Sequence, residues 1–225
     1  MPVKVILTLI IFCTIGCGDS DKIIIDAEKP PEESKVFSKQ DHPLVSAARE
    51  QIGVTTSYDP AYVGLKYPNG DVPMDRGVCS DVVVRALRVA YNQDLQELIH
   101  LDMKKNFRSY PKKWGLKRTD RNIDHRRVLN IRTYLKRQGY SLSIPGIYSA
   151  YQAGDIVTCK VGNLDHIAII SSKRNRENLP YIIHNIGSGA KEDDYLQKLK
   201  ITARFTYPKQ EFNKSMLPTP EGAAN

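Results

Sequence analysis

The chain has 225 residues, of which 33 are Lys or Arg and 25 are Asp or Glu, so its formal net charge at pH 7 is +8. This length fits one folded domain with additional terminal segments, and the domain can bury a core without disulfide bonds. The positive charge favours anionic partners such as cell-wall polymers or lipid head groups, whereas the lack of a recognised binding motif argues against nucleic acid.

The first 17 residues have the pattern of an export signal. One charged residue, Lys4, precedes an apolar stretch over residues 5–15, which is too short to span a bilayer as a stable anchor. Cys17 follows Gly16 at the end of this stretch, which resembles a bacterial lipoprotein signal whose cysteine is acylated. We expect a lipoprotein of the bacterial cell envelope, anchored to a membrane through Cys17 and facing the periplasm. The alternative is a soluble secreted or periplasmic protein.

Three further segments follow the signal. Residues 18–41 are rich in Lys, Glu, Pro and Ser, so we expect them to form a flexible tether. The folded domain is expected over residues 42–208, and residues 209–225 form a polar tail. Within the domain, patterns typical of helices come first and patterns typical of strands come second, which indicates an α+β fold.

The helical patterns occupy the first half of the domain. Residues 44–52 predict a short helix, and residues 79–90 carry apolar side chains on one stripe at helical spacing. Two further helices are expected over residues 95–107 and 126–138, the second of which Gly139 ends.

From Gly154 onward, apolar residues recur at every second position, which predicts strands over residues 155–161, 166–171, 181–184 and 201–207. An antiparallel hairpin between the second and third strands would place His166 and His184 near the same end of adjacent strands. Cys159 shares a strand face with apolar neighbours, which is typical of a core residue. The alternative for Cys159 is a disulfide bond with Cys79, since an exported protein meets oxidising conditions.

Cys79 is the candidate nucleophile, because it begins a predicted helix. The helix dipole and unpaired N–H groups favour a thiolate there, so we expect its pKa to be lowered. His166 can act as its base, and His184 can orient His166. Against this interpretation, a histidine in an apolar strand is more often a buried core residue.

Five sequence blocks together resemble the bacterial family called domain of unknown function DUF1287. The blocks are DRGVCSD at 75–81, NIDHRR at 122–127, GDIV at 154–157, DHI at 165–167 and HNIG at 184–187. That family is similar to the NlpC/p60-type branch of papain-like cysteine peptidases, which cleave peptide or amide bonds in peptidoglycan stems. The resemblance implies a papain-like fold in which N-terminal helices pack on an antiparallel sheet and the nucleophile lies at a helix N-terminus.

The resemblance implies that Cys79, His166 and His184 are catalytic. Asn185 is an alternative to His184 as the orienting residue, and Tyr58 and Ser80 are expected to support the oxyanion together with the backbone N–H of Cys79. The peptidases usually carry Asp-Cys-Ser-Gly, whereas Val78 and Asp81 stand here. The candidate residues of a substrate cleft are Asp75, Arg76, Asp124, His125 and Arg126. The alternative for the last three is that they only cap and solvate the helix that they begin.

The expected function is an exported thiol hydrolase that cleaves an amide or peptide bond in peptidoglycan stem peptides by Cys-His-His catalysis. No cofactor or metal is expected, because neither Cys-x-x-Cys nor His-Glu-x-x-His occurs. The expected partners are peptidoglycan or another anionic envelope polymer, and a membrane through the lipid anchor. Two alternatives remain: an acyltransferase with the same triad, and a cell-wall-binding lipoprotein without catalytic activity.

Overall fold

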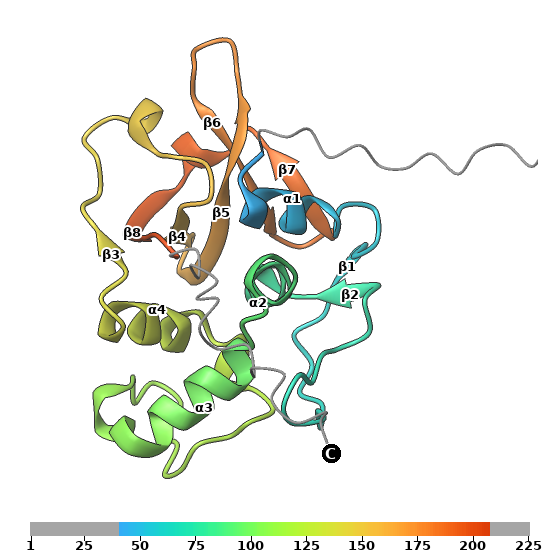
Figure 1. Cartoon of the computed structure of the whole chain (residues 1–225), viewed down its shortest axis with the longest axis vertical. Helices are drawn as coiled ribbons and strands as arrows, with labels where there is room; N and C mark the ends of the chain where they lie inside the picture. Colours follow the sequence, from blue (N-terminus) through green and yellow to red (C-terminus); the bar gives the residue numbers. More distant parts are fainter. Residues whose placement is uncertain (1–40, 208–225) are drawn as a thin grey trace, which may run out of the picture. The chain divides into compact units, whose positions relative to one another are not determined.

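The computed structural model describes residues 41–207. The predicted signal with Cys17, nearly all of the tether and the polar tail lie outside the described residues. Within this range the chain has a mixed helix and antiparallel-sheet fold, as expected, and most of the sheet follows the helices in sequence (Figure 1). No helix of this range combines the length and apolar character needed to cross a membrane.

Four α-helices occupy the positions predicted from helical spacing. They are α1 Pro43–Arg49, α2 Cys79–Tyr91, α3 Leu95–Asn106 and α4 Val128–Arg137. Local residues explain their ends: the Asp94 side chain accepts a hydrogen bond from the amide of Gln96 at the start of α3, and Gly139, with φ of +80°, follows α4. The helix predicted from Arg126 begins instead at Val128, because residues Asp124–Arg126 form a short 3₁₀ helix.

The main sheet has six strands in the order β3-β8-β4-β5-β6-β7, and all neighbours are antiparallel. The strands are β3 Ser141–Leu142, β4 Ile156–Val161, β5 Leu164–Arg174, β6 Pro180–Asn185, β7 Ala190–Asp193 and β8 Lys200–Phe205. The predicted hairpin is the β5–β6 pair, whereas β3 and β7 were not predicted. A separate parallel pair, β1 Ser57–Tyr58 with β2 Arg76–Gly77, lies just before α2.

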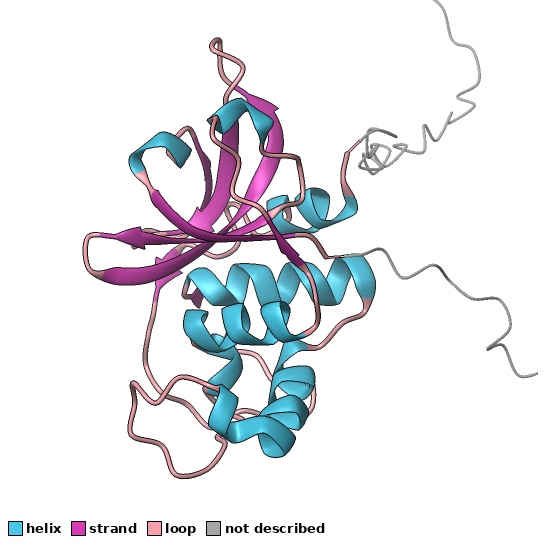
Figure 2. Ribbon diagram, turned by 90° about the vertical axis from the view of Figure 1, so that its left-hand side faces the viewer, coloured by secondary structure: helices cyan, strands magenta, loops and turns pink. Residues whose placement is uncertain are grey.

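The sheet separates two apolar clusters. On one face, side chains of the helices such as Val83 and Leu135 pack with Ile167 and Ile169 of β5, and Figure 2 shows the longer helices gathered on one side of the strands. The opposite face carries a smaller cluster that includes Cys159. Both Cys79 and Cys159 are free thiols, so the disulfide alternative is not present in this structure.

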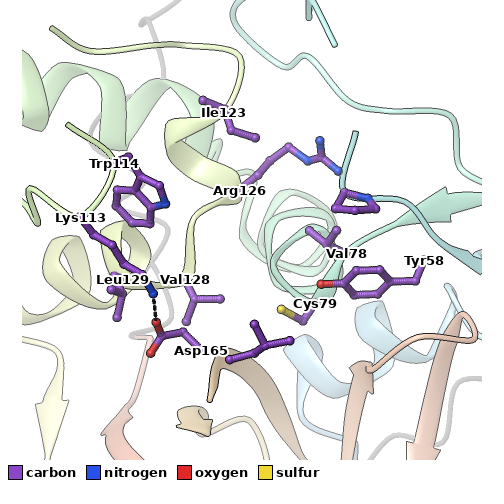
Figure 3. Close-up of a pocket in the computed structure, with 12 residues that line it drawn as sticks. Tyr58, Val78, Cys79, Lys113, Trp114, Ile123, Arg126, Val128, Leu129 and Asp165 are labelled. Carbon is purple, nitrogen blue, oxygen red and sulfur yellow. Dashed lines mark hydrogen bonds and ion pairs between the residues drawn. The ribbon is translucent and has the colours of Figure 1, made fainter. Parts of the chain in front are cut away.

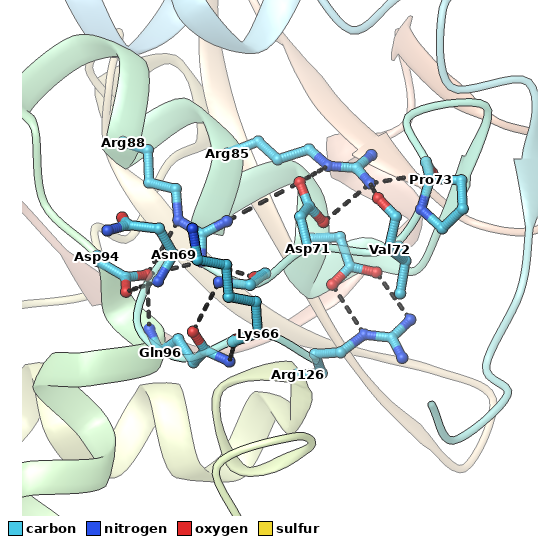
Figure 4. A network of polar contacts seen from close by, with 12 residues as sticks. Lys66, Asn69, Asp71, Val72, Pro73, Arg85, Arg88, Asp94, Gln96 and Arg126 are labelled. Carbon is cyan, nitrogen blue, oxygen red and sulfur yellow. Dashed lines mark hydrogen bonds and ion pairs between the residues drawn. The ribbon is translucent and has the colours of Figure 1, made fainter. Parts of the chain in front are cut away.

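A buried arginine fixes the loop before α2 to the helix itself. The Arg85 guanidinium, 4% exposed, donates to Asp71 at 2.8 and 3.1 Å, to the carbonyl of Val72 at 3.1 Å and to Thr55 at 3.0 Å (Figure 4). One turn further along α2, Arg88 donates to Asp94 at 2.6 Å. These contacts hold residues 70–77 against α2 and thereby fix the approach to Cys79.

Candidate active site

Cys79 is the first residue of α2, and a network of polar contacts holds this helix start in place. The amide of Val78 donates to Asp81 Oδ2 at 2.7 Å, and Asp81 also accepts two hydrogen bonds from Arg126, at 2.9 and 3.0 Å. Ser80 Oγ donates to the carbonyl oxygen of Arg126 at 2.7 Å. Asp81 therefore acts as a helix cap and an ion-pair partner. Ser80 is held by the backbone.

A pocket of about 250 Å³ opens beside Cys79. Figure 3 shows the Cys79 sulfur and the ring of Tyr58 directed into the same hollow, with Trp114 and Lys113 on the opposite wall. The pocket is lined by Tyr58, Pro60, Val78, Cys79, Lys113, Trp114, Ile123, Arg126, Val128, Leu129, Leu164 and Asp165.

The expectation of a lowered pKa at Cys79 is wrong for this structure. Burial raises the pKa of the thiol to about 11, and the charge of Asp81 acts in the same direction. The backbone N–H groups of Ile167, Ser80 and Cys79 itself oppose this shift, but the desolvation of a buried thiolate outweighs them. Cys79 is therefore a protonated thiol at neutral pH.

The two histidines predicted from the hairpin form a hydrogen-bonded pair. His166 Nε2 lies 2.9 Å from His184 Nδ1, so one ring donates and the other accepts. His184 Nε2 lies 3.5 Å from Asp193 Oδ2 of β7, which extends the arrangement to a carboxylate. Burial lowers the pKa of His166 to about 3 and also lowers the pKa of His184, which Asp193 partly offsets. Both rings are neutral at pH 7.

The thiol and the histidine pair lie on opposite faces of the sheet, on either side of β5. Cys79 packs with the cluster that includes Ile167, whereas the strand alternation directs His166 to the face of Cys159, its partner on β4. Among residues 41–207, no hydrogen bond joins the Cys79 sulfur to the His166 ring. The thiolate is instead stabilised by the amide of Ile167, the residue after His166.

Other predicted site residues divide into those beside the thiol and those that support it from a distance. Tyr58 lines the pocket, and its pKa is raised by burial and then by the neighbouring Cys79. Within residues 41–207, the side chain of Asn185 forms no hydrogen bond with either histidine: its Nδ2 donates to the carbonyl oxygens of Ser57 and Gly77, at 3.1 and 3.0 Å. It therefore ties the end of β6 to the loop that precedes Cys79.

Of the five predicted cleft residues, the pocket includes only Arg126. Asp75 and Arg76 form an exposed pair with each other at 3.2 Å. Asp124 is buried, where its carboxylate accepts from the amide of Asp120 at 2.6 Å. His125 is 2% exposed, and burial lowers its pKa to about 4. The 3₁₀ geometry of residues 124–126 turns Arg126 toward the pocket and buries the other two within the helical layer.

The structure also brings three unpredicted residues to the pocket: Lys113, Trp114 and Asp165. Lys113 Nζ lies 3.1 Å from Asp165 Oδ2, and Arg127 holds the Trp114 ring through a cation–π contact of 4.5 Å. Asp165 precedes His166 on β5, so strand alternation could have directed it to the thiol side of the sheet. Nothing in the local sequence places Lys113 and Trp114, because they lie in a loop.

No group of three or more His, Cys, Asp or Glu side chains in the described range forms a metal site. The family described as "Domain of unknown function (DUF1287)" matches residues 45–207 of the chain. The chain is also 49% identical over 179 residues to a protein of Escherichia coli strain K12 named "Uncharacterized protein YijF", which covers 79% of this chain and 87% of that relative. The family match includes the segments that carry Cys79, His166 and His184.

Proposed function

The chain belongs to the DUF1287 family, and we propose that it is an exported thiol hydrolase with a papain-like, NlpC/p60-type fold. Its substrate in this proposal is an amide or peptide bond in peptidoglycan stem peptides. One observation carries the proposal: the hydrogen bond of 2.9 Å between His166 and His184. His166 belongs to β5, and the amide of the next residue, Ile167, faces the Cys79 sulfur. Such a pair of histidines is the arrangement that a base and its orienting residue require.

In the proposed reaction, Cys79 and His166 begin as a neutral pair. His166 accepts the thiol proton while the sulfur bonds to the carbonyl carbon of the substrate, and the protonated imidazole then donates that proton to the leaving amine. Water, deprotonated by the same ring, attacks the thioester, which releases a carboxylic acid and regenerates the thiol. This step requires the His166 ring to reach the sulfur from the opposite face of the sheet, so the proposal includes a movement of the ring or of β5 when substrate binds.

The remaining site residues have supporting roles in this proposal. His184 orients His166, and Asp193 positions His184. The oxyanion would be held by the backbone N–H of Cys79 and the hydroxyl of Tyr58, and each such donor contributes about 3 kcal/mol to transition-state stabilisation in comparable sites. Trp114 and Lys113 form the wall against which the substrate would lie.

The proposed location is the bacterial cell envelope. Acylation of Cys17, followed by the polar tether, would hold the domain at a membrane while it reaches the cell wall. The net charge of +8 supports contact with an anionic wall polymer.

The test incubates the full-length protein with purified peptidoglycan and identifies the products by mass spectrometry. We expect new amino and carboxyl groups within stem peptides from the wild type and from Cys159→Ala, the matched control, and none from Cys79→Ala. Lipid-linked products would instead support acyl transfer. Unchanged peptidoglycan after incubation with the wild type would overturn the hydrolase proposal.

A second candidate, a cell-wall-binding protein without catalysis, is favoured by the state of the thiol. Cys79 is 4% exposed, and its pKa is raised to about 11. Peptidoglycan that is bound but remains intact would support this candidate.

A further inference from the structure

A second, larger concavity of about 940 Å³ lies near the thiol pocket, and its lining is strongly basic. It contains the side chains of Lys104, Lys117, Arg118 and Arg121, together with one carboxylate, Asp120. The oxygens of Asp120 accept from two neutral groups of the same concavity, the hydroxyl of Tyr62 at 3.1 Å and the amide of Asn122 at 3.0 Å. The single negative charge of Asp120 is outnumbered by the four cations.

The four cationic side chains lack internal counter-charges. None of them belongs to an ion pair within residues 41–207. By contrast, Arg85, Arg88 and Arg126, which hold the helix layer together, all pair with carboxylates. Positive charge gathered in a concave surface attracts anions more strongly than the same charges spread over a convex one.

The imidazole of His100 lies in the same concavity. Its Nδ1 is buried without a hydrogen-bond partner among the described residues. Burial lowers the pKa of His100, and the charges of Lys104 and Arg121 lower it further. The ring thus lies in the field of these cations, which the Asp120 carboxylate partly offsets.

The concavity and the thiol pocket share two chain segments as walls. In the loop after α3, Trp114 lines the thiol pocket and its neighbour Gly115 lines the concavity. Before α4, Ile123 lines the thiol pocket and the adjacent Asn122 lines the concavity. A polymer that extends beyond the thiol pocket therefore meets the basic surface.

We propose that this concavity is a binding site for a carboxylate-bearing peptide segment of the same polymer whose amide bond is cleaved at Cys79. The substrate class rests on the proposed function. The chemistry of the site favours carboxylates, because the guanidinium groups of Arg118 and Arg121 can each offer paired N–H donors that match a carboxylate. The site would hold the polymer while the thiol acts on a neighbouring bond.

The test measures equilibrium binding of soluble peptidoglycan fragments with free stem carboxylates to the full chain carrying Cys79→Ala, so that no turnover intervenes. Added to this background, Lys117→Glu with Arg118→Glu changes the concavity. The matched control is Arg132→Glu with Lys136→Glu, which changes the net charge equally but lies in a different hollow, along α4. Lys104→Gln, on the separate element α3, is a milder second variant of the concavity.

We expect the Lys117 and Arg118 variant to weaken binding by about tenfold or more, which corresponds to the loss of one or two charged hydrogen bonds, and the control to bind like the parent. Added salt should weaken the parent more than the variant. Equal losses in variant and control would reduce the effect to net charge and overturn the proposal. Undiminished binding of fragments whose carboxylates are methyl-esterified would overturn it as well.

Three further outcomes are distinguishable, and the last two separate this inference from the proposed function. Binding to phosphatidylglycerol vesicles in place of fragments would assign the site to lipid phosphate and refute a carboxylate site. Loss of fragment binding in the variant, with no cleavage by the active protein, would support the anion site while the hydrolase proposal fails. Cleavage by the active protein, with unchanged binding by the variant, would support the hydrolase proposal and overturn the anion site.

Discussion

At the scale of single residues, Cys79 illustrates how burial can oppose a helix start. The N–H groups at the beginning of α2 favour the thiolate, yet desolvation raises the pKa of Cys79 to about 11. The imidazole of His166 also prefers its neutral form, because burial lowers the pKa of His166 to about 3. Both groups are therefore neutral at rest, and in the proposed reaction nucleophilic attack would be coupled to proton transfer.

This neutral state predicts slow alkylation of Cys79 at neutral pH. The rate with iodoacetamide should rise about tenfold per pH unit and level off only near pH 11, because the thiolate is the reacting form. Peptide mass spectrometry measures the rate, with the Cys159→Ala protein isolating Cys79. In urea the same cysteine should level off near pH 8.5, its ordinary pKa. A native rate that is already constant between pH 6 and 8 would show an ion pair instead.

The relay of His166, His184 and Asp193 predicts a graded series of losses. His166→Ala should lower the cleavage rate by about 10²- to 10⁴-fold or more, the usual contribution of general acid–base catalysis. His184→Asn should retain part of the activity, because Asn can still form one hydrogen bond, and Asp193→Asn should retain more. Steady-state rates on peptidoglycan fragments measure the series, and full activity of His166→Ala would exclude the triad.

At the scale of elements, the start of α2 depends on an ion pair that reaches across the fold. Arg126 and Asp81 are almost fully buried, with side chains 2% and 4% exposed. Arg126 also donates to the carbonyl oxygens of Asp59 and Ala61. The pair thereby connects three separate segments around the thiol pocket, so its loss should affect both stability and the position of Cys79.

Asp81→Ala should lower the free energy of unfolding by about 3–5 kcal/mol, because it leaves the Arg126 guanidinium buried without a counter-charge. The control is Arg137→Ala, which breaks the more exposed pair with Asp102, leaves the hydrogen bond from Tyr110 to Asp102 in place and should cost about 1 kcal/mol or less for that ion pair. Urea unfolding followed by circular dichroism measures both changes. Equal small losses would show that the buried pair contributes little to the fold.

The elements also show what the sequence could and could not predict. Repeating apolar patterns predicted all four helices and strands β4, β5, β6 and β8, because each buries a face that its own sequence displays. Strands β3 and β7 are too short to display a period. The proximity of His166 and His184 was predicted from the hairpin, and their hydrogen bond confirms it. Lys113 and Trp114 were missed because tertiary contacts position their loop. The direction of the pKa shift of Cys79 was predicted wrongly, because the burial of the thiol depends on the whole fold.

At the scale of the whole molecule, the buried histidines connect stability to pH. Burial holds the pKa of His125 at about 4 and that of His166 at about 3, below the ordinary value of 6.5. The unfolded chain therefore binds protons at a higher pH than the folded chain does. The resulting stability is fully present above about pH 6.5 and is lost as the pH falls toward 4 and 3.

Between pH 6 and 4, the free energy of unfolding should fall by up to about 1.4 kcal/mol per pH unit for each buried histidine. Urea unfolding at a series of pH values measures this slope. His125→Gln should reduce the slope without affecting the thiol pocket, which His125 does not line. A stability that stays constant over this range would contradict the burial of neutral imidazoles.

The hydrogen bonds of Asn185 have a consequence for the order in which the site can form. They join Asn185 to Ser57 and to Gly77, which lie 128 and 108 positions earlier in the chain. Both His166 and His184 likewise come late in the sequence. Whenever the chain emerges N-terminus first, from the ribosome or through a membrane channel, Cys79 appears well before His166. The candidate site is therefore complete only after β6 has emerged and paired. In the proposed reaction, a chain that stops short of β6 would carry the cysteine without its base.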